Sequence, residues 1–275
     1  MDKVLAFGKL LTKRIIQVDL FGLSAQLAYF FLLSLFPFLI FLFSLLGYFP
    51  VDEQALLEFI AIYAPADIMD LLSSNVSQIV NKPSSGLLSV GAIGTLWSAS
   101  NGVNAITRAF NRAYEVGENR SFLKSRLIAI ALTIAMVLVI CIALLLPVFG
   151  KMIGEYLFSL FGLSGFISVW NSLRWIISSV FLFIVLLALY KLAPHIVIRL
   201  RDALWGAIFA TVAWQFVSLV FSFYVSTIGN YSATYGSLGA VIMLMIWFYL
   251  SGIIIIGGGI MNAMIHKIRT DKMIN

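Results

Sequence analysis

Unbroken apolar runs of 20 residues or more recur along this chain of 275 residues. An α-helix needs about 20 residues to cross the roughly 30 Å hydrocarbon core of a bilayer. Lipid offers backbone groups no hydrogen-bond partner, so only helices and closed barrels cross it. A barrel strand would alternate apolar and polar residues over about ten positions, which these runs do not. The runs therefore predict an all-α integral membrane protein, with residues 1–275 forming a single membrane domain.

The composition supports this prediction, because only 11% of the residues are charged and 61% are hydrophobic. A soluble domain carries about 25% charged residues, which is enough to cover its surface. Pro37 lies inside the first run and is expected to break or kink it. The sequence predicts six spans, at residues 22–49, 86–108, 127–149, 169–191, 203–229 and 235–264.

The basic residues predict the orientation of these spans. Fifteen of the 18 Lys and Arg residues fall on one side: four in residues 1–21, five in 108–126, three in 191–201 and three in 267–272. Only Lys82 and Lys151 fall on the other side. Because cytoplasmic loops collect Lys and Arg, both termini are predicted to be cytoplasmic. The net charge of +6 is then a consequence of topology, and we expect no nucleic-acid partner.

Two segments outside the spans show helical apolar spacing. In residues 1–21, Val4, Leu11 and Val18 fall on one face, as do Phe7 and Ile15, which predicts a short helix on the cytoplasmic lipid surface. The outer loop 50–85 is expected to form two short amphipathic helices. These helices would form a cap on the outer membrane face; a gate or a surface for docking a partner is the alternative.

The second span carries a polar stripe. Trp97, Asn101, Asn104 and Arg108 are separated by 4, 3 and 4 positions, which places them on one helical face. Such a stripe must face other helices or water. It would line a cavity open to the cytoplasm, where the amides bind polar head groups and Arg108 attracts an anion. Alternatively, the asparagines join helices and Arg108 extends to the interface.

Other polar and small residues extend this set of candidates. Gln26 and Tyr29 on the first span would complete the same cavity, although Gln26 also suits a packing role. Arg174, near the outer end of the fourth span, would bind an anionic ligand, pair with an acid or extend to the interface. Gly206 and Ala210 form a pair that allows close helix packing. The run of three glycines at 257–259 predicts a bend, a hinge or tight packing.

No catalytic pattern is found in the sequence. Cys141 is the single cysteine, and the two histidines, His195 and His266, lie at different helix ends with no cluster of cysteines or carboxylates beside them. We therefore expect no metal site, no cofactor and no enzymatic activity. No acid falls in the middle of a span, so an acid that couples ion movement would be peripheral, such as Asp19 or Asp202.

Three stretches carry a resemblance to a known family: AQLAYFFLLSLFP at residues 25–37, LWSASNG at 96–102 followed by NRAY at 111–114, and YGSLG at 235–239 leading to Trp247. The chain resembles the YihY/BrkB family of bacterial inner-membrane proteins over nearly its whole length. The resemblance implies six helices in the inner membrane. Relatives have carried a ribonuclease label, now regarded as mistaken, and a serum-resistance label, and lipid or lipopolysaccharide-precursor transport has been suggested for some. Members often place a glutamate at the position of Ile260, so ion coupling through that acid is not expected here.

Two functions remain open at this stage. The first is a transporter or translocase with a cavity open to the cytoplasm, for an amphipathic or anionic substrate such as a lipid. The second is a membrane scaffold or envelope-integrity factor that acts through protein partners. An RNA-processing enzyme is disfavoured. We expect membrane lipids and an anionic or amphipathic small molecule as partners, and the patterns also allow a homo-oligomer.

Overall fold

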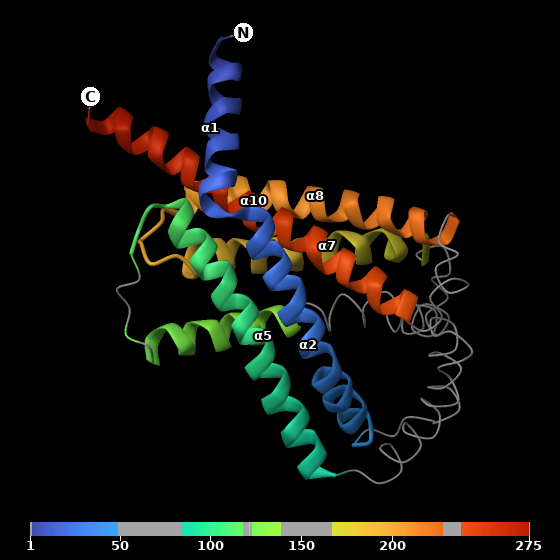
Figure 1. Cartoon of the computed structure of the whole chain (residues 1–275). Helices are drawn as coiled ribbons and strands as arrows, with labels where there is room; N and C mark the ends of the chain where they lie inside the picture. The colour runs from blue at the N-terminus through green and yellow to red at the C-terminus, as the bar shows by residue number, and fades with distance from the viewer. Residues whose placement is uncertain are drawn as a thin grey trace. The chain divides into compact units, whose positions relative to one another are not determined.

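The computed structural model describes residues 2–48, 84–117, 121, 123–138, 167–227 and 238–274. Within this part of the chain every regular element is a helix (Figure 1), which confirms the all-α prediction. The helices in chain order are α1 (Asp2–Val18), α2 (Leu20–Leu46), α5 (Ser85–Ala113), residues 123–138, α7 (Ile167–Leu192), α8 (Leu200–Thr227) and α10 (Leu238–Ile274).

Five of the six predicted spans coincide with these helices, with shifts at their ends. The third, 127–149, is helical as far as residue 138, where its described part ends. α2 is continuous through Pro37, so the helix is not broken there. α10 continues ten residues beyond the predicted end of the last span. The outer loop 50–85 lies almost entirely outside the described residues, so its predicted cap stays a prediction.

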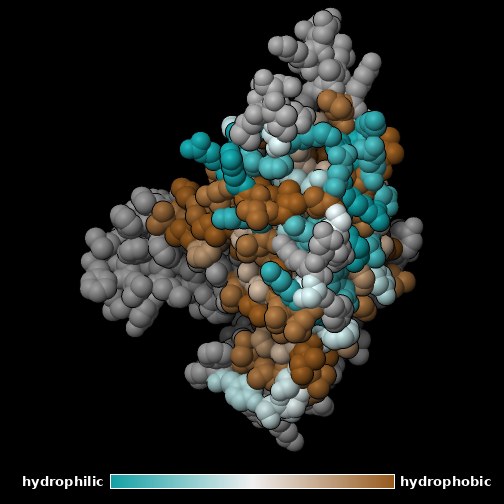
Figure 2. All heavy atoms as spheres, turned by 90° about the vertical axis from the view of Figure 1, so that its left-hand side faces the viewer, coloured by the Kyte–Doolittle hydropathy of each residue, from teal (hydrophilic) through white to brown (hydrophobic). Residues whose placement is uncertain are grey.

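In the part of the chain that the structure describes, three helices are long and apolar enough to cross a membrane: Leu20–Leu42, Leu200–Val225 and Val241–Thr270. A shorter apolar helix covers Ile176–Leu192. On α8 the large apolar side chains point outward, because Val212, Phe216 and Phe223 are each about two-thirds exposed. A soluble protein buries such residues, so this exposed apolar face indicates a lipid environment. Hydrophobic side chains also cover much of the face in Figure 2.

The chain divides into two compact units. The first unit comprises Met1–Leu23, Val103–Phe216 and Ile253–Asn275, and the second comprises Ser24–Gly102 and Val217–Gly252. Helices α2, α5, α8 and α10 each contribute to both units.

The first unit is built around a close contact between α8 and α10. A methyl group added at Gly206 or at Gly258 would collide with the backbone oxygen of the other residue. Ala203, Ala207 and Ala210 are fully buried on the same side of α8. Small residues let two helix backbones approach closely in a membrane. The predicted small-residue packing of α8 is therefore confirmed, and α10 is its partner.

Tight packing explains two of the three consecutive glycines. α10 is helical throughout residues 257–259. A methyl group at Gly258 would collide with Tyr190, and one at Gly259 would collide with Phe110. Both rings are fully buried, with centroids 5.3 Å apart. At Gly257 the nearest atom would be 4.0 Å away, on Phe209, so this glycine is not required by space.

The second unit pairs α2 with α5. A methyl group at Gly91 would lie 2.6 Å from the backbone nitrogen of Phe41, and one at Gly94 would lie 3.0 Å from Pro37. Further along, Gly102 packs on Leu27. Along α5 the residue numbers of these contacts increase, while those of their partners on α2 decrease, so the two helices are antiparallel. The three glycines of α5 therefore allow a close approach of the two helices.

Candidate functional site

The two predicted site residues of α2 lie on its open side. Gln26 is exposed, and Tyr29 is 56% exposed in the second unit. Leu27, which stands between them, is fully buried against Gly102 of α5. Gln26 and Tyr29 are therefore not part of the α2–α5 packing surface.

The predicted stripe follows one side of α5. Trp97 is 65% exposed, and Asn101, Asn104 and Arg108 are each half-buried. Residues on the other side of the helix are buried, as their small exposed fractions show: Ala99, Val103, Ile106 and Phe110. The stripe is thus the more accessible side of α5. Trp97 and Asn101 belong to the second unit, and Asn104 and Arg108 to the first. Arg174 is on α7, but its side chain lies outside the described part of the structure.

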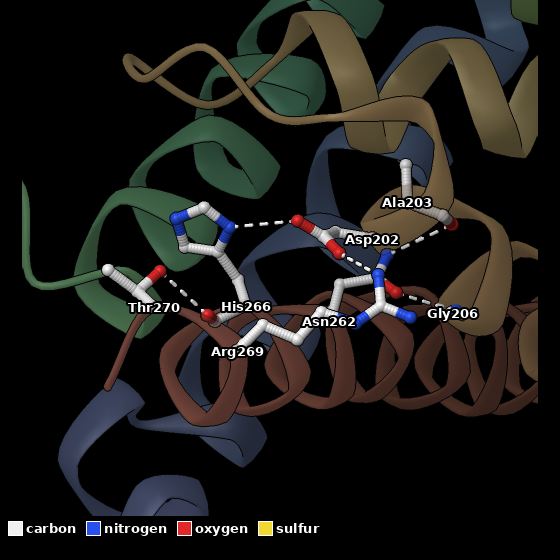
Figure 3. Close-up of polar contacts among 7 residues, drawn as sticks. All are labelled: Asp202, Ala203, Gly206, Asn262, His266, Arg269 and Thr270. Carbon is white, nitrogen blue, oxygen red and sulfur yellow. Dashed lines mark hydrogen bonds and ion pairs between the residues drawn. The ribbon is translucent and has the colours of Figure 1, made fainter. Parts of the chain in front are cut away.

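A cluster that the sequence did not predict lies where α8 begins and α10 ends (Figure 3). Asp202, in the first turn of α8, has only 3% of its side chain exposed. Its Oδ2 lies 3.0 Å from His266 Nδ1, and its Oδ1 accepts a hydrogen bond of 2.5 Å from Arg269. A buried carboxylate is costly unless it is paired. The two α10 side chains supply that pairing, so Asp202 is a buried link between α8 and α10 at the end of the predicted span.

Asn262 makes a second link one turn deeper. Its Oδ1 accepts a hydrogen bond of 2.6 Å from the Gly206 amide, and its Nδ2 donates one of 3.2 Å to the Ala203 carbonyl. The side chain is fully buried. Figure 3 shows Asn262 and Asp202 bridging the same two helices. The amide therefore binds the backbone of α8 at the point where Gly206 lets α10 approach.

Glu115 joins three segments at the end of α5. One oxygen lies 2.6 Å from Arg14 of α1, and the other lies 3.3 Å from Lys267 of α10. The Arg14 guanidinium, followed by Lys267, lowers the pKa of Glu115 from 4.5 to about 2. The carboxylate is therefore ionised throughout the physiological range.

The backbone at Glu115 is unusual for a glutamate. Its φ is 56°, in the left-handed region that glycine favours. The amides of Glu115 and Val116 donate to the carbonyls of Arg112 and Asn111, the pattern that closes a helix with a left-handed residue. Glycine is the usual residue at that position, so the glutamate is retained at a conformational cost. The two ion pairs are the evident compensation.

The NRAY motif lies at the same end of α5 and connects to two other elements. The backbone amide of His195, in the α7–α8 loop, donates a hydrogen bond of 2.9 Å to Asn111 Oδ1. Tyr114 packs edge-on against His266, with ring centroids 5.8 Å apart. Burial, with a smaller contribution from Asp202, raises the pKa of the Tyr114 hydroxyl. Asn111 Nδ2 and the Tyr114 hydroxyl are buried, and among the described residues neither has a hydrogen-bond partner.

Of the two histidines, His266 has one carboxylate beside it in the described part of the chain, Asp202, which is 64 positions away in the sequence. Separations of this size leave no local pattern, so only the pairing of α8 with α10 reveals the link. Among the described residues, no three His, Cys, Asp or Glu side chains are grouped closely enough to hold a metal ion.

Long apolar helices with outward-facing apolar side chains, joined at one end by buried polar links, define a helical integral membrane protein. A comparison with protein families gives the particular family: the model described as "Virulence factor BrkB" matches residues 11–273. The chain therefore belongs to the BrkB family, which confirms the predicted resemblance.

Curated relatives agree with this assignment. The chain is 57% identical over 245 residues to the ribonuclease-like protein YfkH of Bacillus subtilis (strain 168), covering 89% of each chain. It is 25% identical over 272 residues to the UPF0761 membrane protein XAC0937 of Xanthomonas axonopodis pv. citri, covering 95% of this chain and 62% of the relative. The chain thus spans less than two-thirds of the length of the Xanthomonas relative. No solved structure matches the chain.

Proposed function

We propose that this protein is a membrane transporter or translocase for an amphipathic or anionic substrate, with membrane lipid as the first class to test. The observation that carries the proposal is the accessible polar side of α5. Asn101, Asn104 and Arg108 keep part of their surface exposed, while Val103 and Ile106 between them are buried. Polar side chains at membrane depth are costly, and they commonly mark the path of a substrate or ion.

The chemistry of this side suits a molecule with a polar head and an apolar body. An asparagine amide both donates and accepts hydrogen bonds, and a guanidinium binds phosphate or carboxylate through two parallel bonds. Trp97 offers a large exposed ring for the apolar part. Gln26, Tyr29 and Arg174 remain further candidates for substrate contacts.

The proposed setting is the bacterial inner membrane, crossed six times with both termini in the cytoplasm, and with no catalytic step. The support is the uneven distribution of Lys and Arg along the chain. Single cysteines in a C141S background test it. S121C should react with a membrane-impermeant maleimide only after the cells are opened, whereas S84C should react in intact spheroplasts; the reverse pattern would refute this topology.

Flux in reconstituted vesicles tests the transport role. The probes are NBD-labelled phosphatidylglycerol for lipid and carboxyfluorescein for a soluble anion. The N101L/N104L variant should lose most of the protein-dependent flux of whichever probe moves. T107V is the matched control, because Thr107 is buried off the stripe on α5 and its hydroxyl donates a hydrogen bond of 3.0 Å to the Val103 carbonyl of the same helix.

Full flux in N101L/N104L would exclude the stripe from the pathway. Loss of flux in T107V as well would show that any change in α5 impairs the protein, and the stripe would carry no special role. If neither probe moves in the unaltered protein while one stoichiometric protein partner copurifies, the scaffold function takes the place of transport.

A further inference from the structure

The loop between α7 and α8 exposes apolar and basic side chains together. Val197 is 97% exposed, and Leu192 and Leu200, at the adjoining helix ends, are each 49% exposed. Lys191, Arg199 and Arg201 are also exposed. We call this set of six residues the basic–apolar edge.

The loop is held firmly in this conformation. Pro194 and Ile198, on either side of the exposed valine, are buried. The His195 amide is bonded to Asn111, and the Asp202 amide donates a hydrogen bond of 2.9 Å to the Arg199 carbonyl. Because the residues on both sides of Val197 are fixed to the first unit, the loop conformation keeps the Val197 side chain exposed.

The three cations of the edge have no acidic partner in the described part of the chain. The ion pairs found there use Arg14, Lys267, His266 and Arg269, with Glu115 and Asp202 as the acids. Those two carboxylates are therefore already engaged by other bases. Among the described residues, no carboxylate neutralises the charge of the edge, which can therefore attract an anionic ligand.

The position of the basic–apolar edge relative to the apolar helices indicates which ligand it would bind. Lys191 and Leu192 end the apolar helix Ile176–Leu192, and Leu200 begins the apolar segment Leu200–Val225. The edge thus stands where two apolar helices leave the lipid, at the depth of the phospholipid head groups. An apolar tip flanked by Lys and Arg fits the boundary between acyl chains and anionic head groups.

From this geometry we infer that the basic–apolar edge binds the anionic phospholipid head groups of the adjacent leaflet, with Val197 inserted among the upper acyl carbons. This surface is separate from the polar side of α5 and does not depend on the proposed transport role. It gives the first unit a preferred lipid neighbour at the α7–α8 loop.

The test places an NBD label at position 197 in a V197C/C141S protein, reconstituted in phosphatidylcholine with or without 30% phosphatidylglycerol. Near an anionic surface each basic residue contributes roughly fivefold to affinity. Anionic lipid should therefore shift the emission to the blue and strengthen quenching by phosphatidylcholine that carries a doxyl group on its upper acyl carbons. Adding K191Q/R199Q/R201Q should abolish that dependence on phosphatidylglycerol.

The matched control is K13Q/R112Q/K124Q, which removes the same charge from exposed positions elsewhere in the first unit. It should leave the lipid dependence unchanged. Identical quenching in both vesicle types would overturn the inference even if the triple variants fold poorly, because that comparison uses the unaltered basic residues. Reversal of the shift by millimolar glycerol 3-phosphate would also overturn it, since a soluble phosphate site would then explain the signal. Equal loss in the control triple would show that only overall charge matters.

Discussion

Replacing Asn262 with alanine tests whether the buried amide holds α8 to α10. The side chain is fully buried and makes two hydrogen bonds to the α8 backbone, one to the Gly206 amide and one to the Ala203 carbonyl. N262A removes both bonds and leaves a small space beside Gly206. The ion pairs of Asp202 would remain, so the variant separates the amide link from the charged one.

The expected loss follows from these contacts. Each hydrogen bond contributes about 0.5–1.5 kcal/mol to the free energy of unfolding. The space left by the amide costs up to about 1 kcal/mol more. Together these contributions amount to about 1–4 kcal/mol, so we expect N262A to lower the free energy of unfolding by about 2.5 kcal/mol, the middle of that range. For a chain of this size, that corresponds to a fall in Tm of about 5–10 °C.

Q215A is the matched control. Gln215 also joins two helices through an amide, but by one bond of 2.9 Å from its Nε2 to Ser179 Oγ. Side-chain hydrogen bonds between membrane helices average about 0.6 kcal/mol. Thermal unfolding in detergent, followed by size-exclusion fluorescence, should rank N262A well below Q215A. If the two variants have the same Tm, the bonds from Asn262 to the α8 backbone contribute no more than an ordinary interhelical contact, and the reasoning is wrong.

Three further predictions each compare the Tm of two closely related proteins. G258A should lower the Tm by several degrees, because the added methyl collides with Tyr190 and overpacking costs about 1–3 kcal/mol, whereas G257A should melt at or above the parent temperature. E115G should have a higher Tm than E115Q. Both variants remove the ion pairs, but only glycine relieves the strain of the left-handed backbone, which is worth roughly 1–2 kcal/mol. Equal Tm values would show that the φ of 56° carries no strain. Because the folded pKa of Glu115 is lowered to about 2, its ion pairs should stabilise fully above pH 4.5 and be lost as pH falls towards 2. Solvent screening keeps this contribution small, and a pH series of Tm values for the parent and E115Q should converge only at the acid end.

Much of the fold follows from residue patterns because lipid restricts the choices. Apolar runs predict helices, and glycine and alanine at intervals of three or four predict where backbones meet. The face of α8 that carries Gly206 and Ala210 is buried as expected. For the three glycines the pattern left bend, hinge and packing open. Tyr190 and Phe110, more than 60 positions away, decide the matter in favour of packing.

The polar cluster could not be predicted for the same reason. Asp202, His266 and Arg269 each lie near a helix end, where a lone charged residue ordinarily extends to the interface. Nothing near Asp202 in the sequence indicates that His266 and Arg269 lie beside it. Their meeting depends on the register between α8 and α10, which is set by the fit of Gly206 against Gly258. The stripe on α5, by contrast, is defined within one helix, so its residues could be grouped from spacing alone.

The two kinds of polar residue in this protein should therefore respond differently to mutation. Lipid supplies little force to hold helices together, so buried links such as Asn262 and Asp202 contribute to stability directly. The residues on the accessible side of α5 are less buried than their neighbours, so we expect their replacement to cost less stability. If the protein moves a substrate, N262A should lower thermal stability and flux together, whereas N101L/N104L should lower flux at nearly unchanged Tm. A stripe variant that loses stability in proportion to flux would instead make Asn101 and Asn104 part of the helix packing, and the pathway would have to lie elsewhere.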